Sequence, residues 1–255
     1  MKRIISYNVN GIRAALTKGF DTWLDVTNPD IVCLQEIKAS PDQLDLSIFD
    51  KRGYHHYWFP AEKKGYSGVA ILTKDKPMSI TYGSGMNDSD REGRVIRADF
   101  GDVSVLSVYA PSGTTGEVRQ DFKMEWLVAF QKFVTKLKKE RPNLILAGDF
   151  NICHKAIDIH NPISNARSSG FLPEEREWMD QFTDKGLTDS FRFFNKEPHQ
   201  YTWWSFRANS REKNLGWRID YQFVTRELEK NLKHSVLLPE AKHSDHCPVM
   251  LEVNF

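Results

Sequence analysis

The stretch from Leu144 to Asn151 constrains the fold more than any other, because it joins a short apolar run to two polar side chains. Pro142 precedes the run and polar residues follow it, a pattern typical of a buried strand. Side chains of a strand alternate between faces, so we expect Asp149 and Asn151 to leave the strand end on the same side. An unpaired buried carboxylate is unfavourable, which favours a cation or a reacting group nearby. The alternative is that Asp149 caps a following helix.

Length and composition predict one sizeable folded domain. The chain has 255 residues, of which 40% are hydrophobic and 12% aromatic, and this argues against disorder. It contains no Gly/Ser run, charge block or low-complexity stretch that would mark a linker. We therefore expect a single domain over residues 1–255. The net charge of +1 gives no nucleic-acid signal, so any basic surface must be local.

The cysteines and the first residues bear on the compartment. Cys33, Cys153 and Cys247 are scattered and form no CxxC pair, which suggests a reducing environment. The sequence turns polar by Asn8, too early for a signal peptide. No run approaches the ~18 apolar residues of a membrane span. We expect a monomeric cytoplasmic protein with no membrane contact.

Apolar periodicity predicts an α/β layered sandwich. Helical spacing appears over residues 12–24, with a break near Gly19, over 116–141, and from 173 onward. The apolar stripe of the 116–141 helix comprises Val118, Phe122, Trp126, Phe130, Phe133 and Leu137. Strands are expected over residues 3–8, 31–36, 54–59, 68–73, 78–82, 94–100, 103–109, 144–149, 201–206, 218–225 and 248–253.

Two segments of the chain have similar sequence patterns. Residues 29–36 align without gaps on residues 142–149; each segment follows a helix and ends in an acid. This favours a two-fold repeated layout, although a proline followed by apolar residues is also common wherever a helix leads into a strand.

Five predicted strand ends carry polar groups, namely Asn8 with Asn10, Glu36, Asp149 with Asn151, Asp220, and Asp245 with His246. The ligands are mostly oxygen donors, which suits Mg²⁺ or Mn²⁺. The pair His243-x-x-His246 allows a zinc alternative, but no third ligand stands at a recognisable spacing. Tyr109 either adds a hydroxyl or is a half-buried aromatic. A metal with acids, amides and one histidine suits phosphoryl transfer, and no nucleophilic Ser or Cys motif or glycine-rich phosphate loop competes.

A basic cluster, Lys136, Lys138, Lys139 and Arg141, lies at the end of the 116–141 helix. Complementation of the helix dipole on a solvated face explains it; the alternative is a DNA contact.

Seven motifs in order resemble the exonuclease III/AP endonuclease family of the DNase I-like metal-dependent phosphoesterases. They start at Asn8 (NVNGIR), Leu34 (LQEIK), Tyr66 (YSGV), Tyr109 (YAP), Gly148 (GDFN), Gly216 (GWRIDY) and Ser244 (SDHCP). The resemblance covers essentially the whole chain. It implies a four-layer α/β sandwich of two mainly antiparallel or mixed sheets flanked by helices, with an internal pseudo-two-fold axis.

The resemblance also implies roles for residues at matching positions. Glu36 corresponds to the principal metal ligand, with Asn10 and Asp245 near the metal and Asp149 and Asn151 as further candidates. Asp149 would orient or deprotonate the attacking water. Asn8, Asn151 and Tyr109 correspond to phosphate-contacting or positioning groups, and His246 with Asp220 to a dyad at the scissile phosphate. Substrate-binding positions are Trp203, Trp217 and Ile219, which line the pocket for an abasic sugar, together with Arg13, Ser112 and Arg207.

The chain departs from the family pattern at a few positions. Asn10 stands where some members have Asp, Ser112 where many have Asn, and Thr115 and Arg207 at positions of variable DNA-penetrating side chains. The expected function is a Mg²⁺-dependent DNA-repair hydrolase that nicks duplex DNA 5′ to abasic sites and acts on 3′ ends as an exonuclease and phosphodiesterase. The alternatives are a phosphatase or phosphodiesterase of inositol phosphates or lipids, and a catalytically inactive nucleic-acid-binding module.

Overall fold

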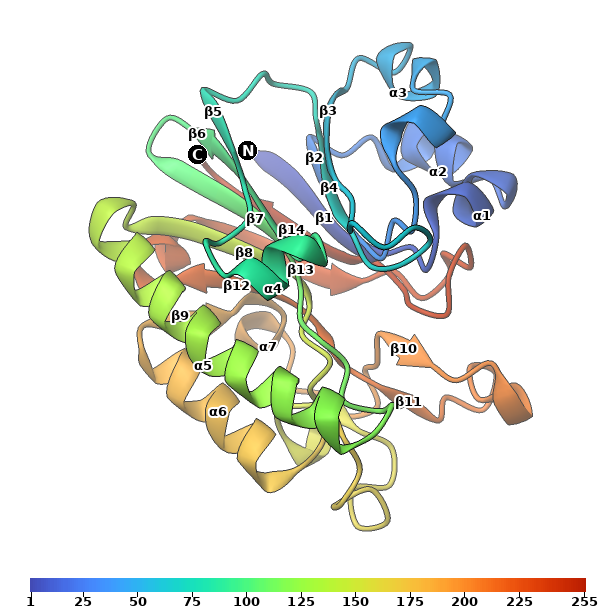
Figure 1. Cartoon of the computed structure of the whole chain (residues 1–255), viewed down its shortest axis with the longest axis vertical. Helices are drawn as coiled ribbons and strands as arrows, with labels where there is room; N and C mark the ends of the chain where they lie inside the picture. Colours follow the sequence, from blue (N-terminus) through green and yellow to red (C-terminus); the bar gives the residue numbers. More distant parts are fainter.

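The computed structural model describes residues 1–255 and contains two six-stranded sheets packed face to face between helices (Figure 1). The first sheet has the order β13 (Leu232–Leu237), β14 (Val249–Val253), β1 (Lys2–Asn8), β2 (Ile31–Gln35), β4 (Val69–Thr73) and β3 (His55–Phe59). The second has the order β5 (Ser79–Tyr82), β6 (Val95–Phe100), β7 (Val103–Tyr109), β8 (Asn143–Asp149), β12 (Asp220–Thr225) and β9 (Leu187–Asp189).

The two sheets repeat one pattern of pairing. In each, the third and fourth strands of the order are parallel, β1 with β2 and β7 with β8, and the other neighbours are antiparallel. The repeated segments at 29–36 and 142–149 form β2 and β8, which are equivalent strands of the two sheets. The predicted two-fold layout is therefore confirmed.

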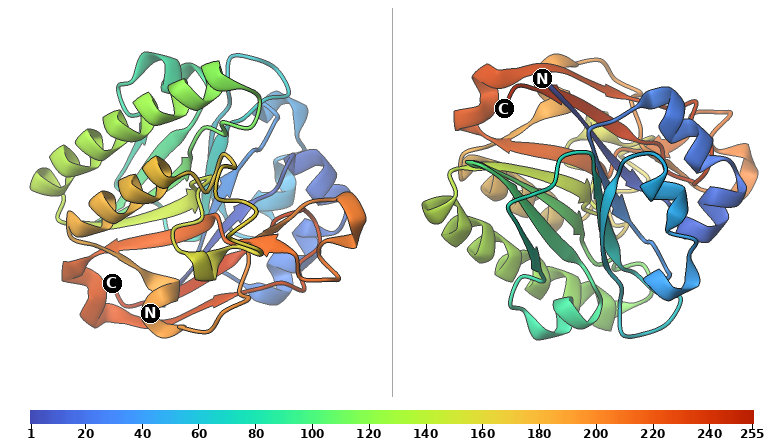
Figure 2. Two further views of the ribbon diagram at one scale, coloured as in Figure 1. Left: turned by 90° about the horizontal axis from the view of Figure 1, so that it is seen from below. Right: turned by 90° about the horizontal axis from the view of Figure 1, so that it is seen from above.

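Alternation along the strands produces the four layers (Figure 2). Ile4 of β1 packs between the sheets, whereas Ile5 packs against the helices on the outer face. In β8, Ile145 faces the other sheet and Leu146 faces the outer helices. Because both faces of each sheet are covered, the central strands are buried on both faces, and β2 and β8 are mostly apolar, as the sequence predicted.

Helices cover the outer faces. The first sheet carries α1 (Ile12–Thr17), α2 (Phe20–Thr27) and α3 (Ser47–Asp50); the second carries α5 (Glu117–Glu140) and α6 (Pro173–Asp184). Two short helices, α4 (Asn87–Arg91) and α7 (Ser190–Phe194), lie in connections. Gly19, at φ 85°, separates α1 from α2 as predicted. No helix is long and apolar enough to cross a lipid bilayer.

Two expectations about elements need correction, and some short or edge elements were not predicted. Val118 is 82% exposed and lies outside the apolar stripe of α5, whereas Val134 is buried in it. The strand expected over 201–206 is reduced to β10 (Trp203–Trp204), which pairs with β11 (Gly216–Trp217) and forms a single bridge to His246. Edge strand β13 was not predicted, because Lys233 and His234 are exposed and interrupt the apolar pattern.

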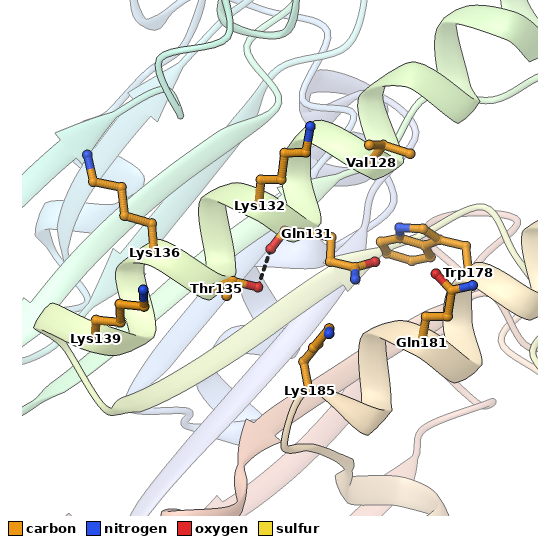
Figure 3. Close-up of a pocket in the computed structure, with 9 residues that line it drawn as sticks. All are labelled: Val128, Gln131, Lys132, Thr135, Lys136, Lys139, Trp178, Gln181 and Lys185. Atoms are coloured by element: carbon orange, nitrogen blue, oxygen red, sulfur yellow. Dashed lines mark hydrogen bonds between the residues drawn. The ribbon is translucent and has the colours of Figure 1, made fainter.

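The basic end of α5 borders a groove against α6 (Figure 3). Lys132, Lys136, Lys139 and Lys185 line it, while Lys138 donates to the carbonyls of Lys185 and Gly186 just after α6. Lys138 and Lys139 lie in the last turn of α5, where the predicted complementation of its dipole places them, but the Lys138 ammonium binds carbonyls that follow α6. This groove lies at the end of α5 remote from the polar strand ends, since β8 starts there and runs back toward Asp149.

Candidate active site

Six segments meet at one edge of the sandwich. Strands β1, β2, β7 and β8 end there, so they deliver Asn8, Glu36, Tyr109 and Asp149. Asp220 opens β12 rather than ending it, and it lies opposite Asp149 because β12 runs antiparallel to β8. The same reversal brings the residues that precede β14 to this edge, since β14 is antiparallel to β1.

Asn8 joins the two sheets across the site. Its side-chain Nδ2 donates to Glu36 Oε1 at 2.8 Å and to Asp149 Oδ2 at 2.9 Å. Glu36 belongs to the first half of the repeat and Asp149 to the second. Because both amide hydrogens are engaged, Asn8 orients the two carboxylates in this state and has no hydrogen left for a phosphate.

Tight turns, rather than strand alternation, aim the polar groups. Asn10, Glu36 and Asn151 have φ values of 46°, 50° and 54°. Asn8 Oδ1 accepts from the Asn10 backbone N–H at 3.0 Å, and Asp149 Oδ1 accepts from Asn151 N–H at 2.8 Å. Both are local side-chain-to-backbone turns of the kind that Asn and Asp favour. Asp149 and Asn151 do lie together, but by this turn and not by the strand periodicity expected.

His246 and Asp220 form a buried pair. His246 Nδ1 lies 2.9 Å from Asp220 Oδ2, and the Asp220 backbone N–H donates to Thr202 Oγ1 at 3.1 Å. Burial disfavours the imidazolium, but the Asp220 carboxylate outweighs it and raises the pKa of His246 to about 10. The ring is therefore protonated at neutral pH. Nδ1 donates to Asp220, which leaves the Nε2 hydrogen as a donor on the other side.

Asp149 lies next to this pair. Its side chain is 1% exposed, and Oδ2 is 4.0 Å from His246 Nε2. Burial, followed by repulsion from Asp220, raises the pKa of Asp149 to about 8. The edge thus concentrates more negative charge than its hydrogen bonds compensate, and the buried Asp220 Oδ1 has no hydrogen-bond partner.

The donor set fits a hard divalent cation. Carboxylate oxygens of Glu36 and Asp149 and a ring nitrogen of His246 lie within 4.8 Å of one another. Because the His246 ring is protonated, the two carboxylates are the members of this group that could bind a cation. Lys38 Nζ is 2.7 Å from Glu36 Oε2 and donates to Asn10 Oδ1 at 2.5 Å, and this ammonium lowers the pKa of Glu36 against the effect of burial. A cation bound by Glu36 would share that carboxylate with Lys38. His243 does not join this group, as its ring packs on Tyr7, Phe20 and Trp23, so the structure offers no paired-histidine zinc site.

A cavity of about 640 Å³ opens beside these groups. It is lined by Glu36, Tyr109, Ser112, Gly113, Thr114, Gly116, Asn151, Ser168, Ser169, Gly170, Trp203, Trp217, Ile219, Asp245 and His246. The rings of Trp203 and Trp217 meet edge to face with centroids 6.0 Å apart, and Trp203 Nε1 donates to Asp245 Oδ2 at 3.0 Å. The cavity therefore has a charged end and an aromatic wall.

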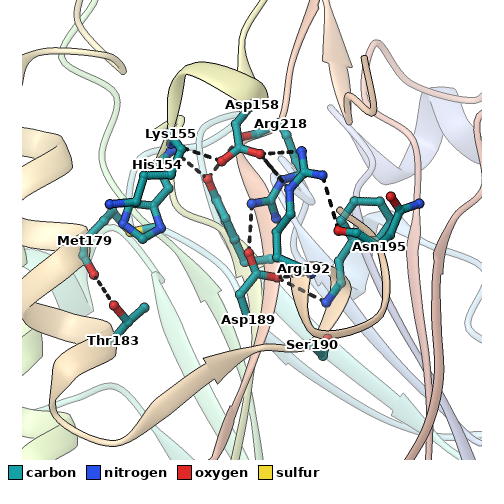
Figure 4. Close-up of polar contacts among 12 residues, drawn as sticks. His154, Lys155, Asp158, Met179, Thr183, Asp189, Ser190, Arg192, Asn195 and Arg218 are labelled. Atoms are coloured by element: carbon teal, nitrogen blue, oxygen red, sulfur yellow. Dashed lines mark hydrogen bonds and ion pairs between the residues drawn. The ribbon is translucent and has the colours of Figure 1, made fainter. Parts of the chain in front are cut away.

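A buried ionic network holds the segment between Trp217 and Ile219, and Figure 4 shows its side chains. Arg218 lies between Trp217 and Ile219 in sequence, but its side chain turns away from the cavity to Asp158, with Nε 2.8 Å from Oδ1. Arg192 Nη2 contacts the same oxygen at 2.7 Å. Burial is outweighed by the Arg218 charge, so the pKa of Asp158 falls to about 2. Two short strands thus gain a rigid support that their few ladder hydrogen bonds do not provide.

The structure gathers most of the predicted site residues at this edge. Asn8, Asn10, Glu36, Tyr109, Ser112, Asp149, Asn151, Trp203, Trp217, Ile219, Asp220, Asp245 and His246 line the cavity or bond directly to residues that line it. Arg13 and Arg207 are exposed and do not line it, and neither does Thr115. Asp245 and Asn10 bond to each other at 2.9 Å, outside the closest group of ligand atoms.

Sequence reasoning assigned no role to several residues of the site. Lys38 ends the LQEIK motif, and its position two residues after Glu36 was the available signal. Thr202, which accepts from the backbone of both Ile219 and Asp220, and Gly170 gave no signal. Their places depend on how distant loops fold over the strand ends.

Together, the fold and this edge define a phosphoesterase of the four-layer α/β-sandwich class. The chain belongs to the Endonuclease/Exonuclease/phosphatase family, whose model matches residues 5–246. It is similar to an exodeoxyribonuclease of Bacillus subtilis, with 41% identity and 99% of each chain covered, and to the DNA repair nuclease APEX1 of Danio rerio, with 42% identity over 98% of this chain and 81% of that protein. A solved 3′ phosphatase from Neisseria, bound to a product DNA hairpin, superposes with a TM-score of 0.92 at 30% identity, covering all of both chains.

Proposed function

We propose that this chain is a DNA-repair nuclease that hydrolyses the backbone 5′ to abasic sites and also acts on 3′ ends as an exonuclease and 3′-phosphodiesterase. The observation that carries the proposal is the juxtaposition of the Glu36, Asp149 and His246 group with an aromatic-walled cavity. Relatives that match nearly the whole chain are named as DNA nucleases. The predicted alternative, action on inositol phosphates or lipids, is not favoured by them.

The charged end of the cavity would hold the scissile phosphate. Mg²⁺ or Mn²⁺, held by Glu36 and Asp149, would supply positive charge to a phosphate oxygen. His246, kept cationic by Asp220, donates its Nε2 hydrogen to another phosphate oxygen and stabilises the charge that develops there. Asp149, ionised beside the bound cation, would orient the attacking water and accept its proton, and its burial makes it a stronger base than an exposed carboxylate. Asn151 and Tyr109 border the phosphate and fix its position.

The aromatic wall would select the lesion. An abasic sugar lacks a base, so extruding it from the duplex requires no unpairing of that residue. Trp203, Trp217 and Ile219 enclose the space beside the phosphate and would exclude a nucleotide that carries a base. Contacts to the DNA backbone, for which Arg13, Ser112 and Arg207 are candidates, would add affinity that does not depend on sequence.

We further propose that residues 1–255 act as one catalytic domain, as a monomer, in a reducing cytoplasm. Residues from both halves of the chain build the site, which supports a single catalytic domain. Cys33, Cys153 and Cys247 are all buried free thiols.

Incubation with a labelled duplex carrying one tetrahydrofuran abasic analogue tests the function. We expect a single nick 5′ to the analogue in Mg²⁺, no nick in EDTA, and no internal nick in an intact duplex of the same sequence. Cleavage at the end of a duplex with a 3′-phosphate measures the proposed activity on 3′ ends. Absence of cleavage in all duplexes, together with phosphate release from inositol phosphates, contradicts the proposal.

A further inference from the structure

A fully buried ion pair joins the two outer helices behind the site. Lys123 Nζ of α5 lies 2.5 Å from Glu175 Oε1 of α6, and both side chains are 0% exposed. Neither residue lines the cavity. Replacing a buried ion pair by apolar residues of similar size is often neutral or stabilising, so general stability is a weak reason for such a pair. The backbone groups that the two side chains bind provide a better reason.

Lys123 holds the turn that carries the acidic end of β8. Its Nζ donates to the backbone carbonyl of Asn151 at 2.8 Å. Asn151 has φ 54°, lines the cavity, and directs its side-chain Nδ2 to the Ala110 carbonyl at 3.0 Å. The ammonium therefore fixes the peptide that follows the Asp149 turn.

Glu175 holds the opposite wall. Its Oε2 accepts from the backbone N–H of Gly170 at 2.6 Å and of Leu172 at 2.9 Å. Gly170 lies between the two sides of the cavity, since a Cβ there would be 2.9 Å from the ring of Trp217 and 3.1 Å from the Asn151 carbonyl. Its positive φ of 95° also favours glycine. The position of Gly170 thus sets how near Trp217 can come to Asn151.

We infer that Lys123 and Glu175 are a positioning pair that sets the spacing between Asn151, at the phosphate end of the cavity, and Trp217, in its aromatic wall. Neither touches substrate; they act through the Asn151 carbonyl and the Gly170 N–H. The inference rests on the proposed function, because that spacing matters only if one substrate engages both sides. A misplacement of about 1 Å in such a site lowers the rate by up to ~10²-fold.

The test separates positioning from stability by removing the pair as a unit. Lys123→Met and Glu175→Met are made singly and together, and thermal unfolding and steady-state incision of the abasic-analogue duplex are measured for each. The single variants leave one buried charge unpaired and should unfold at lower temperature. The double variant should unfold at a higher temperature than either single variant, although below the wild type because the Asn151 carbonyl and the Gly170 and Leu172 N–H groups lose their partners. Its kcat should stay at least ~10-fold low, and the ratio of abasic to intact cleavage should fall.

Two controls complete the design. The double variant Lys132→Met/Gln181→Met changes the same two helices at the groove remote from the cavity and should leave kcat and the cleavage ratio unchanged. Hydrogen exchange of the Asn151 amide, which donates to Asp149, reads the turn without any nuclease assay; it should be faster in the Lys123→Met/Glu175→Met protein.

Wild-type kcat and cleavage ratio in that double variant would overturn the inference and leave the pair a structural one. Unchanged exchange of Asn151 would overturn it as well, whatever the activity. A wild-type protein that fails to incise the abasic duplex counts against the proposed function instead, and then the exchange measurement alone decides whether the pair sets the turn.

Discussion

Single residues in unusual backbone conformations aim the groups of this site. Asn10, Glu36 and Asn151 occupy the left-handed region, which is unfavourable by roughly 1–2 kcal/mol for a residue with a side chain. Asn tolerates it best, and Glu36 is the less usual case. Its conformation turns the chain at the end of β2, so that its carboxylate meets Asn8 and Lys38 instead of continuing along the strand.

The charge of Asp149 gives the first prediction at this scale. Asp149→Asn keeps the shape of the side chain but removes the group that accepts the proton of water, so we expect at least ~10² lower kcat with abasic-site DNA binding retained. The raised pKa means that the ionised carboxylate destabilises the fold. In EDTA the wild type should therefore lose stability relative to the variant as pH rises through about 8.

Turnover and urea unfolding at several pH values measure both effects. Near wild-type kcat in Asp149→Asn would remove this residue from the reaction. A stability difference that does not change between pH 6 and 9 would contradict the direction of its pKa shift.

At the scale of elements, the aromatic wall depends on ions more than on secondary structure. β10 and β11 contribute two residues each, so few ladder hydrogen bonds hold Trp203 and Trp217. Arg218 and Asp158 make the underlying support, in which the Arg218 backbone N–H also donates to the Asp158 carbonyl at 2.7 Å.

Acid should weaken this support. Asp158 has a pKa of about 2 in the fold, below its ordinary 3.8, so its stabilising contribution is complete above pH 3.8 and is lost as pH falls toward 2. The contribution is on the order of 2 kcal/mol at neutral pH. Asp158→Asn should be less stable than wild type at pH 7, and the gap should narrow between pH 4 and 3. Urea midpoints at these three pH values test it, and a constant gap would mean that Asp158 acts without its charge.

At the scale of the whole molecule, the site lies where two copies of one layout meet. β2 delivers Glu36 from the first sheet and β8 delivers Asp149 from the second, and Asn8 bonds to both. The carboxylates converge only when the sheets pack face to face. A cation that binds between them should therefore stabilise the packed molecule as a whole.

Metal binding should consequently raise the melting temperature. A cation at a hundred times its dissociation constant contributes about 2.7 kcal/mol, which for a chain of 255 residues is several degrees. Glu36→Gln should reduce the upward shift measured by differential scanning calorimetry in Mg²⁺, because a neutral ligand binds a hard cation less well. Asp102→Asn, at an exposed turn remote from the site, serves as the control and should keep the full shift. An equal shift in Glu36→Gln would place the cation elsewhere.

The sequence by itself determined the elements and the inventory of the site. Apolar periodicity located the central strands, α5 and α6, because burial on one or both faces leaves a local signature. The acids at the strand ends marked one reactive edge, and the repeat at 29–36 and 142–149 indicated the paired sheets. Tertiary structure alone decided which groups touch: Asn8 across the two carboxylates, Lys38 at Glu36, and Lys123 with Glu175 behind the cavity. These contacts join residues that are far apart in the chain or that are turned by a positive φ. Neither a long-range contact nor a positive φ produces a periodic pattern in the sequence.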